Sequence, residues 1–227
     1  MKLVRVGRMK ALILPVTPLQ QNCSIIWEDE SLRAAVVDPG GEVERIMAEI
    51  QRRNLKLDKI LLTHAHMDHA AGTAKLAALC KIPIEGPHPD DQFLIDELPA
   101  HAARYGFPPS ASFVPDRWLA DGDCVTLGAE EFKVSHCPGH TPGHVVFFHE
   151  SQRLAWVGDV LFAGSIGRSD FPRGNHADLV DSIRRKLFPL GDDVTFVPGH
   201  GPVSTFGQER QTNPFVADRL FMEPNAS

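Results

Sequence analysis

The sequence predicts an α/β fold in which helices cover mixed β-sheets. Short apolar segments of the strand type alternate with helical segments in both halves of the chain. In both halves a histidine or an aspartate follows directly after a strand, and strand ends are where α/β folds usually place their sites. The chain has 227 residues, enough for a substantial core, so we expect a single domain over residues 1–227.

The first half of the chain alternates strands with helices. Strands are expected where apolar residues run between turn-forming residues, and helices where apolar residues recur at intervals of three and four. Pro39-Gly40-Gly41 ends the third strand, because proline and glycine favour a turn. In chain order we expect strands at 11–16, 23–27 and 33–38, a helix at 43–52, a strand at 58–63, a helix at 73–79 and a strand at 81–85.

The second half repeats this alternation after a long excursion. Residues 87–118 are rich in proline and aspartate, and we expect one helix within them, near residues 90–97. The later helix should bury the face that carries Leu179, Val180, Ile183 and Leu187. The remaining expected elements are strands at 124–127, 132–136, 145–149 and 154–157, a helix at 177–188 and a last strand at 194–197.

The composition is that of an ordinary globular protein, and it excludes some partners. The net charge of −6 indicates no basic surface for nucleic acid or an anionic membrane, so we expect neither. Four cysteines, none at CxxC spacing, indicate reduced thiols rather than a disulfide framework. The apolar run at residues 11–14 is too short for a secretory signal or a membrane span. We therefore expect a cytoplasmic location.

The most informative stretch is the heptapeptide at residues 63–69, THAHMDH. Four residues able to bind a metal fall within six positions of one another, directly after an apolar strand: His64, His66, Asp68 and His69. Buried without a metal, they would need many hydrogen-bond partners to offset their desolvation. With one or two divalent ions, the same residues can form a site that activates water.

The spacing within the heptapeptide separates these residues into two pairs. His64 and His66 are two positions apart, so at an extended strand end their side chains point to the same side. Asp68 and His69 follow where the chain should turn into a helix, so they can face a neighbouring position. We expect each pair to hold one ion. Nitrogen and oxygen ligands without a thiolate suit zinc, iron or manganese.

Three later segments place a histidine or an aspartate among glycine and proline, which fix a sharp turn. They are PGHTPGH with His140 and His144, GD with Asp159, and PGHG with His200. Taken singly, a PGH turn can carry a solvated histidine, and Gly-Asp after a strand is more often a turn or a helix cap. Together with the heptapeptide they indicate a metal site. Pro142 argues against a helix that would align His144 with His140, so we expect a structural role for His144.

The motifs THxHxDH, PGHTPGH, GD and PGHG, in this order, resemble those of the metallo-β-lactamase superfamily. The chain is most similar to the type II glyoxalase branch (hydroxyacylglutathione hydrolases) and to its compact bacterial YcbL-type subgroup, through the segments GRSDFPRG and LGDDVTFVPGHGP. The resemblance covers nearly the whole chain and implies an αββα sandwich of two mixed β-sheets flanked by helices. Only 27 residues follow His200, so we expect no C-terminal helical substrate domain.

The resemblance also implies a complete ligand set for two divalent metal ions, with zinc as the first expectation and iron or manganese as alternatives. Asp38 is expected to orient a ligand from behind, although an aspartate before Pro-Gly also fits a turn. The implied ligands are His64, His66 and His140 for the first ion, Asp68, His69 and His200 for the second, and Asp159 bridging both.

By resemblance, the reaction is hydrolysis of a 2-hydroxyacyl thioester such as S-lactoylglutathione, as in methylglyoxal detoxification. The expected nucleophile is a hydroxide shared by two ions, oriented by Asp68 and Asp159 as the catalytic carboxylates. The alternative is a persulfide dioxygenase on the same fold, with a single iron held by His64 or His66 together with His140 and Asp159. A scaffold without catalysis is disfavoured because no ligand of the set is missing.

The substrate-binding residues follow from the same resemblance. Arg168 stands nine positions after the bridging acid, and arginine suits a carboxylate well, so Arg168 and then Arg173 are expected to bind substrate. A surface salt bridge is the alternative for either. The binding tyrosines of the larger glyoxalases have no counterpart, since Tyr105 is the only tyrosine. The expected partner is a small-molecule thioester, with a glutathione conjugate as the example, and the oligomeric state is left open.

Overall fold

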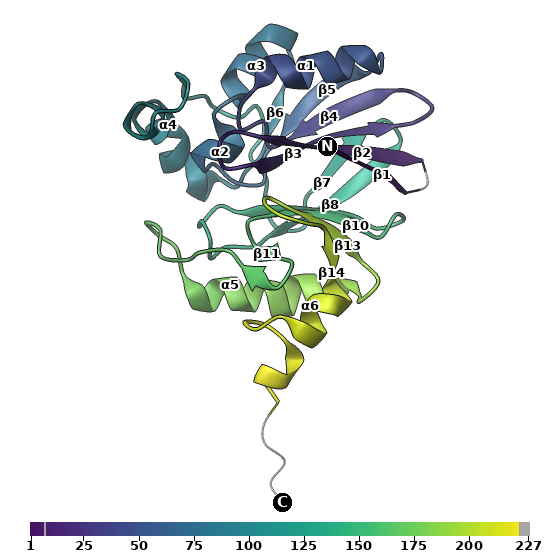
Figure 1. The fold of residues 1–227 in the computed structure, drawn as a ribbon, viewed down its shortest axis with the longest axis vertical. Coiled ribbons are helices and arrows are strands. Elements are labelled where there is room, and N and C mark those ends of the chain that lie inside the picture. The colour runs from purple at the N-terminus through teal and green to yellow at the C-terminus, as the bar shows by residue number, and fades with distance from the viewer. Residues whose placement is uncertain (7, 223–227) are drawn as a thin grey trace, which may run out of the picture.

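A computed structural model describes residues 1–6 and 8–222 of the chain. Gly7 and residues 223–227 belong to the expected domain of residues 1–227 and lie outside the described residues. Two β-sheets pack face to face, and helices lie against their outer faces (Figure 1). The expected αββα sandwich of two mixed sheets is therefore confirmed.

The first sheet has six strands in the order β1-β2-β3-β4-β5-β6. The first four pair antiparallel, while β4, β5 and β6 run parallel. Parallel strands end at the same edge, which brings the loops after β4 and β5 together. The strands are β1 (Lys2–Val6), β2 (Met9–Val16), β3 (Gln21–Glu28), β4 (Arg33–Val37), β5 (Lys56–Leu61) and β6 (Ile84–Glu85).

The second sheet also has six strands, in the order β14-β13-β10-β9-β8-β7. Only β10 and β13 pair parallel, so their carboxyl ends lie side by side. A small ribbon of β11 (Leu161–Phe162) and β12 (Ser165–Ile166) follows β10. The six strands are β7 (Cys124–Leu127), β8 (Glu130–His136), β9 (Val145–His149), β10 (Leu154–Gly158), β13 (Thr195–Pro198) and β14 (Ser204–Thr205).

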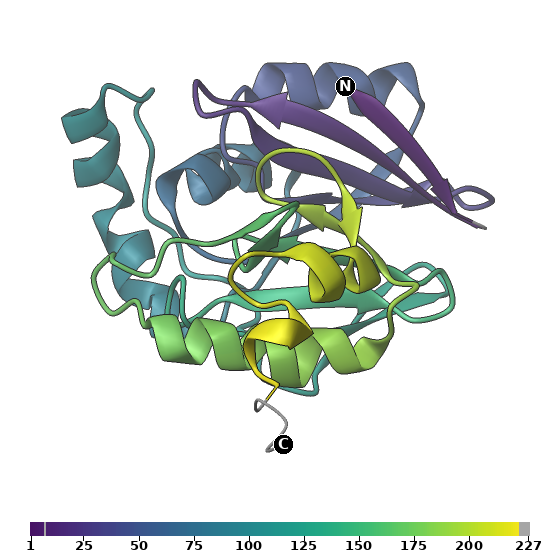
Figure 2. The same ribbon diagram turned by 60° about the horizontal axis from the view of Figure 1, so that its bottom comes forward.

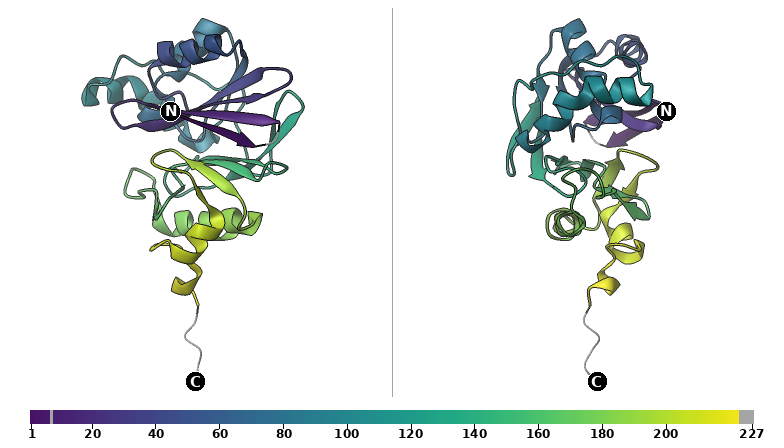
Figure 3. Two further views of the ribbon diagram at one scale, coloured as in Figure 1. Left: turned by 45° about the vertical axis from the view of Figure 1, so that its right-hand side comes forward. Right: turned by 90° about the vertical axis from the view of Figure 1, so that its left-hand side faces the viewer.

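The helices are divided between the two outer faces. Figure 1 shows α1 and α3 above the first sheet and α5 and α6 below the second, and Figure 2 shows α5 running along that lower face. The views in Figure 3 show the same layering from two other sides. The helices are α1 (Val43–Arg52), α2 (Met67–Ala70), α3 (Thr73–Cys80), the 3₁₀ turn η1 (Pro89–Asp91), α4 (Gln92–Tyr105), α5 (His176–Ser182), η2 (Ile183–Leu187), η3 (Phe188–Leu190), α6 (Phe206–Thr212) and η4 (Asp218–Leu220).

Three apolar layers hold the sandwich together. In β2, Ala11 and Ile13 pack between the sheets, whereas Leu12 and Leu14 pack with α1 and α4, because successive side chains of a strand point to opposite faces. The third layer lies between the second sheet and α5 and α6. Phe147 is fully buried between the sheets, where such a side chain contributes about 1.5–3 kcal/mol.

The structure differs from the expected elements in a few places. The helix expected at 177–188 is α-helical only to Ser182 and continues as the π-helix η2. Leu179, Ile183 and Leu187 are nevertheless all buried, since a repeat of four residues exceeds 3.6 per turn and fits a wider helix. The helix expected near 90–97 extends to Tyr105. The strand expected at 58–63 instead begins and ends two residues earlier, at Lys56–Leu61, and the strand expected at 81–85 is confined to Ile84–Glu85.

Further elements were not expected, and each is short or lies at a sheet edge; they include β1, the two strands of the β11–β12 ribbon, β14, α6 and the 3₁₀ turn η4. Across the residues that the structure describes, no helix combines the length and the apolar character needed to span a bilayer.

Candidate metal centre

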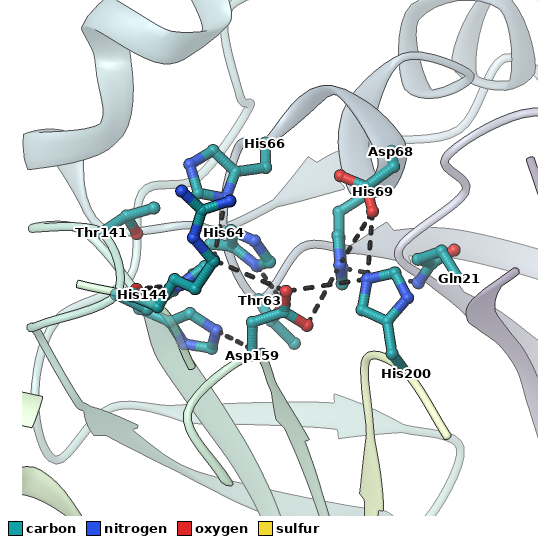
Figure 4. Close-up of polar contacts among 12 residues, drawn as sticks. Gln21, Thr63, His64, His66, Asp68, His69, Thr141, His144, Asp159 and His200 are labelled. Atoms are coloured by element: carbon teal, nitrogen blue, oxygen red, sulfur yellow. Dashed lines mark hydrogen bonds and ion pairs between the residues drawn. The ribbon is translucent and has the colours of Figure 1, made fainter. Parts of the chain in front are cut away.

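The seven ligands expected from the sequence come together at one edge of the sandwich. The heptapeptide follows β5 of the first sheet, while His140 precedes β9, Asp159 follows β10 and His200 follows β13 of the second. Figure 4 shows the side chains from both sheets pointing toward one another. The site therefore lies across the two halves of the molecule.

His64, His66 and His140 form the first group of donor atoms. One ring nitrogen from each lies within 4.8 Å of the others. The closest pair is His66 Nδ1 and His140 Nε2, which are 2.8 Å apart, and their rings meet edge to face. His64 and His66 do face the same side, as their spacing in an extended segment predicts.

Asp68, His69 and His200 form the second group. His66 is extended, with φ −62° and ψ 149°, and the short helix α2 begins at the next residue, so Asp68 and His69 lie on its first turn. His200 Nε2 lies 3.0 Å from Asp68 Oδ2, and His69 Nε2 lies 3.8 Å from the same oxygen. The turn into a helix therefore separates the two pairs of the heptapeptide.

Asp159 lies between the two groups (Figure 4). Its Oδ1 is 3.3 Å from His69 Nε2, and its Oδ2 is 3.5 Å from His140 Nε2 and 3.7 Å from His200 Nε2. The preceding residue, Gly158, has φ +48°, and a Cβ there would come within 2.5 Å of Thr63 Oγ1. Glycine is thus needed for the turn that aims Asp159 at the site.

The donor atoms fit divalent cations. His64 Nε2, His69 Nε2 and Asp159 Oδ1 are buried and have no hydrogen-bond partner within the described part of the chain. A buried polar atom without a partner costs about 1–3 kcal/mol, so several in one place need a ligand. Two atoms that each lie about 2.0–2.2 Å from one ion are themselves about 3–4 Å apart, which matches the separations of 3.0 to 3.8 Å that involve Asp68 and Asp159.

The protonation of the site residues also suits metal ligands. Burial, together with the charge of His140, lowers the pKa of His66 to about 3, so the ring is neutral at neutral pH. Burial raises the pKa of Asp159, but the charges of His69 and His140 outweigh this and bring its pKa well below its ordinary value. The site thus offers a neutral His66 and an ionised Asp159, the forms that bind a cation. At His69 burial lowers the pKa, but the charges of Asp159 and Asp68 outweigh it and raise the pKa well above its ordinary value, so a cation bound there replaces a proton.

Hydrogen bonds made by Nδ1, the ring nitrogen that faces away from the site, fix the orientation of three ligand rings. Nδ1–H of His69 donates to Asp38 Oδ2 at 2.9 Å, and the same carboxylate accepts from the N–H and hydroxyl of Thr63. His140 Nδ1 donates to the Arg168 carbonyl at 2.6 Å, and His200 Nδ1 donates to a backbone carbonyl at 3.1 Å. In each ring Nε2 then carries the lone pair that faces the site.

His144 supports the site without offering a free lone pair to it. Its Nε2 accepts the backbone N–H of Asp159 at 3.0 Å, and its ring stacks on His64 with the centroids 4.6 Å apart. This contact agrees with the structural role expected for His144. Thr63 and Asp91, which the sequence reasoning did not single out, also contact these loops; only the position of Thr63 inside the motif signalled its role.

The arginines expected to bind substrate lie at the rim rather than against the ligand atoms. Arg168 is exposed, pairs with Asp170 at 2.8 Å and lies 4.5 Å over the Phe171 ring. The Phe171 ring in turn lies 4.9 Å from that of His66. Arg173 is exposed and packs over Phe93 at 4.2 Å. Arg168 therefore forms a surface salt bridge, which was the alternative to substrate binding. It nevertheless lies next to the first group, since its carbonyl accepts a hydrogen bond from His140.

One further donor group lies outside this site. His88, Asp90 and His136 also bring three donor atoms within 4.8 Å. The rings of His88 and His136 are stacked with an interplanar angle of 14°, so their lone pairs run nearly parallel instead of converging. This geometry does not suit a shared ion.

Comparison with known protein families agrees with this geometry. Residues 16–200 match the metallo-beta-lactamase superfamily, and the matched range contains all seven expected ligands. The chain belongs to the metallo-β-lactamase superfamily. The resemblance seen in the sequence motifs is thereby confirmed.

Relatives within the superfamily cover nearly the whole chain. The protein is 46% identical over 209 residues to hydroxyacylglutathione hydrolase GloC of Haemophilus influenzae, covering 92% of this chain and 98% of that one. The solved structure of BLEG-1 B3 metallo-beta-lactamase aligns with TM-score 0.84 and 34% identity, over 91% and 99% of the two chains. TTHA1623 in a di-iron-bound form aligns with TM-score 0.82 and 36% identity, over 90% and 99%.

These relationships confirm that this metallo-β-lactamase-fold protein is a hydrolase, and its histidine and aspartate groups indicate a metal site. One aligned structure carries two iron ions, whereas the ligand chemistry led us to expect zinc first. The identities of the metal and the substrate are therefore part of the function that we propose.

Gly40 provides a test of how tightly the loops are fitted around the site. A Cβ on Gly40 would lie 1.5 Å from the Asp68 carbonyl oxygen, whereas a Cβ on Gly41 would meet only Thr17 Cγ2, at 3.2 Å. We expect Gly40→Ala to shift the first turn of α2, to lower the free energy of unfolding by about 1–3 kcal/mol and to weaken metal retention. Urea denaturation and metal analysis measure both effects. Gly41→Ala is the matched control, and equal behaviour of the two variants would contradict the prediction.

Proposed function

We propose that the protein hydrolyses 2-hydroxyacyl thioesters of the S-lactoylglutathione type to a hydroxy acid and a free thiol. The observation that carries the two-metal part of this proposal is the position of Asp159, whose carboxylate lies within 3.7 Å of ring nitrogens from both donor groups. The substrate class is supported by the relative named hydroxyacylglutathione hydrolase, at 46% identity over nearly its full length.

In this proposal the first group and the second group each hold one divalent ion, and Asp159 is shared by both. Zinc is the metal we favour, with iron and manganese as the other metals that suit nitrogen and oxygen ligands. When bound, two such ions lower the pKa of a shared water and polarise a substrate carbonyl.

The chain's own residues have three tasks in this reaction. Asp68 and Asp159 present carboxylate oxygens that accept hydrogen bonds from the attacking water and so fix its direction. Asp38 keeps the proton of His69 on Nδ1, as its 2.9 Å contact with that atom requires. Four of the seven ligand residues are buried, which limits the access of bulk water and strengthens the electrostatic interactions inside the site; they are His64, His69, His140 and Asp159.

The alternative, a persulfide dioxygenase with one iron, uses only the ligands of the first group together with Asp159. It assigns no metal to Asp68, His69 and His200, although their donor atoms also lie within 4.8 Å of one another. The second group is therefore the observation that favours hydrolysis over oxygenation.

The substrate end of the proposal rests on the rim residues. Arg168 and Arg173 are the cations we assign to the carboxylates of a glutathione thioester, and Phe171 supplies an apolar wall beside His66. We also propose a cytoplasmic location, because all four cysteines are free, as expected where thiols stay reduced.

The direct test is hydrolysis of S-lactoylglutathione by the purified protein, with metal content measured on the same sample. We expect turnover that is lost on treatment with a chelator and restored by zinc. Asp159→Ala should lower activity by at least about 100-fold. Loss of a residue that only hydrogen-bonds to a metal ligand costs about 10–100-fold, and loss of a direct ligand should cost more. Oxygen uptake with glutathione persulfide is the parallel assay. Uptake without thioester hydrolysis would establish the alternative instead.

Arg168 tests the substrate class separately. Because a hydrogen bond to a charged group is worth about 1.5–3 kcal/mol, Arg168→Ala should raise KM for the anionic lactoylglutathione by about tenfold or more. KM for the neutral lactoyl thioester of N-acetylcysteamine should change little. Arg185→Ala, at an arginine with a 79% exposed side chain that pairs with Asp181, is the control. Equal changes for both thioesters would remove Arg168 from the binding site.

A further inference from the structure

A buried carboxylate connects the two loops that carry the first donor group. Asp91, in η1 ahead of α4, is 0% exposed. Its Oδ2 accepts the backbone N–H of Ala65 at 3.0 Å and the hydroxyl of Thr141 at 2.9 Å. Its Oδ1 accepts the backbone N–H of Gly143 at 2.6 Å.

The residues that donate to Asp91 are immediate neighbours of the ligands. Ala65 lies between His64 and His66, and Thr141 directly follows His140. The first of these loops comes from the first sheet and the second from the second sheet. A single side chain therefore joins the two halves of the molecule at the point where the first group is assembled.

Burying the Asp91 carboxylate between the two loops costs free energy, and a role as an exposed helix cap would avoid that cost. Burial raises its pKa to about 6, even though the three donors act to lower it. Aspartate is a favoured helix cap, and Asp91 stands at the N-cap of α4, yet its side chain makes no capping hydrogen bond. Asp90, one residue earlier, has a 58% exposed side chain and contacts His88 instead.

The loops are also packed tightly against this carboxylate. A Cβ added to Gly143 would lie 2.5 Å from the Asp91 nitrogen and 2.7 Å from its carboxylate. The carboxylate accepts hydrogen bonds from Thr141 and Gly143 of one loop and from Ala65 of the other. The distance between the two loops therefore depends on the length and the charge of the Asp91 side chain.

We propose that Asp91 is a positioning residue that sets the distance between His140 and the His64–His66 pair and so determines how tightly the first ion is held. Its effect on turnover rests on the proposed function. Its effect on metal binding rests on the geometry alone.

The test compares Asp91→Asn with Asp90→Asn, which makes the same chemical change one residue away and outside the network. Metal-free protein is titrated with Zn²⁺ against a competing chelator, and the visible spectrum of the Co²⁺-loaded protein reports ligand geometry. We expect Asp91→Asn to weaken one of the two Zn²⁺ binding steps by at least about tenfold, to alter the Co²⁺ spectrum and to lower kcat more than it raises KM. Asp90→Asn should match the wild type.

Thr141→Val keeps Asp91 and removes one of its three donors, so it serves if Asp91→Asn does not fold. It should weaken Zn²⁺ binding in the same direction but less, and adding it to Asp91→Asn should cause no further loss, because the two residues act through one contact. Wild-type Zn²⁺ affinity and Co²⁺ spectrum in folded Asp91→Asn, or in Thr141→Val, would overturn the proposal. Absence of thioester hydrolysis in the wild type would overturn the proposed function and leave the metal titration decisive for Asp91.

Discussion

Hydrogen bonds from Nδ1 of three ligand histidines fix the orientation of their rings, and the rest of the site is arranged around these orientations. His69 donates through Nδ1 to Asp38, and His140 and His200 donate through Nδ1 to backbone carbonyls. Each bond leaves a lone pair on Nε2, and these lone pairs converge on buried space together with ionised Asp159. Because His64 Nε2, His69 Nε2 and Asp159 Oδ1 are buried without hydrogen-bond partners in the described part of the chain, bound cations would offset the cost of their desolvation.

The sandwich is the means by which residues distant in sequence meet this constraint. The parallel pairs β4–β5 and β10–β13 end at the same edge, and a residue of the site or its support follows each strand within two positions. The sheets themselves are held by apolar layers that do not involve the site residues. Contacts between the loops, such as those of Thr63 and Asp91, then set the distances between the site residues.

The sequence was sufficient for those features that depend on local patterns. The heptapeptide predicted both donor pairs, because two-residue spacing in an extended segment and a turn into a helix are local properties. It was not sufficient for Asp91, which lies in an irregular excursion and acts through residues 26 to 52 positions away. The sequence also could not predict the direction of the Arg168 side chain. An exposed arginine can pair with any nearby carboxylate, here that of Asp170, and no periodic pattern specifies which one.

Seven side chains are proposed to form two adjacent cation sites that share Asp159. Anomalous diffraction from crystals of the zinc-loaded protein tests this proposal most directly, because the method locates each ion independently of activity. We expect two peaks about 3.5–4 Å apart, one among His64, His66 and His140 and one among Asp68, His69 and His200, with Asp159 in contact with both. A single peak at this edge, or a peak beside His88 and His136 with this edge empty, would contradict the shared two-cation site.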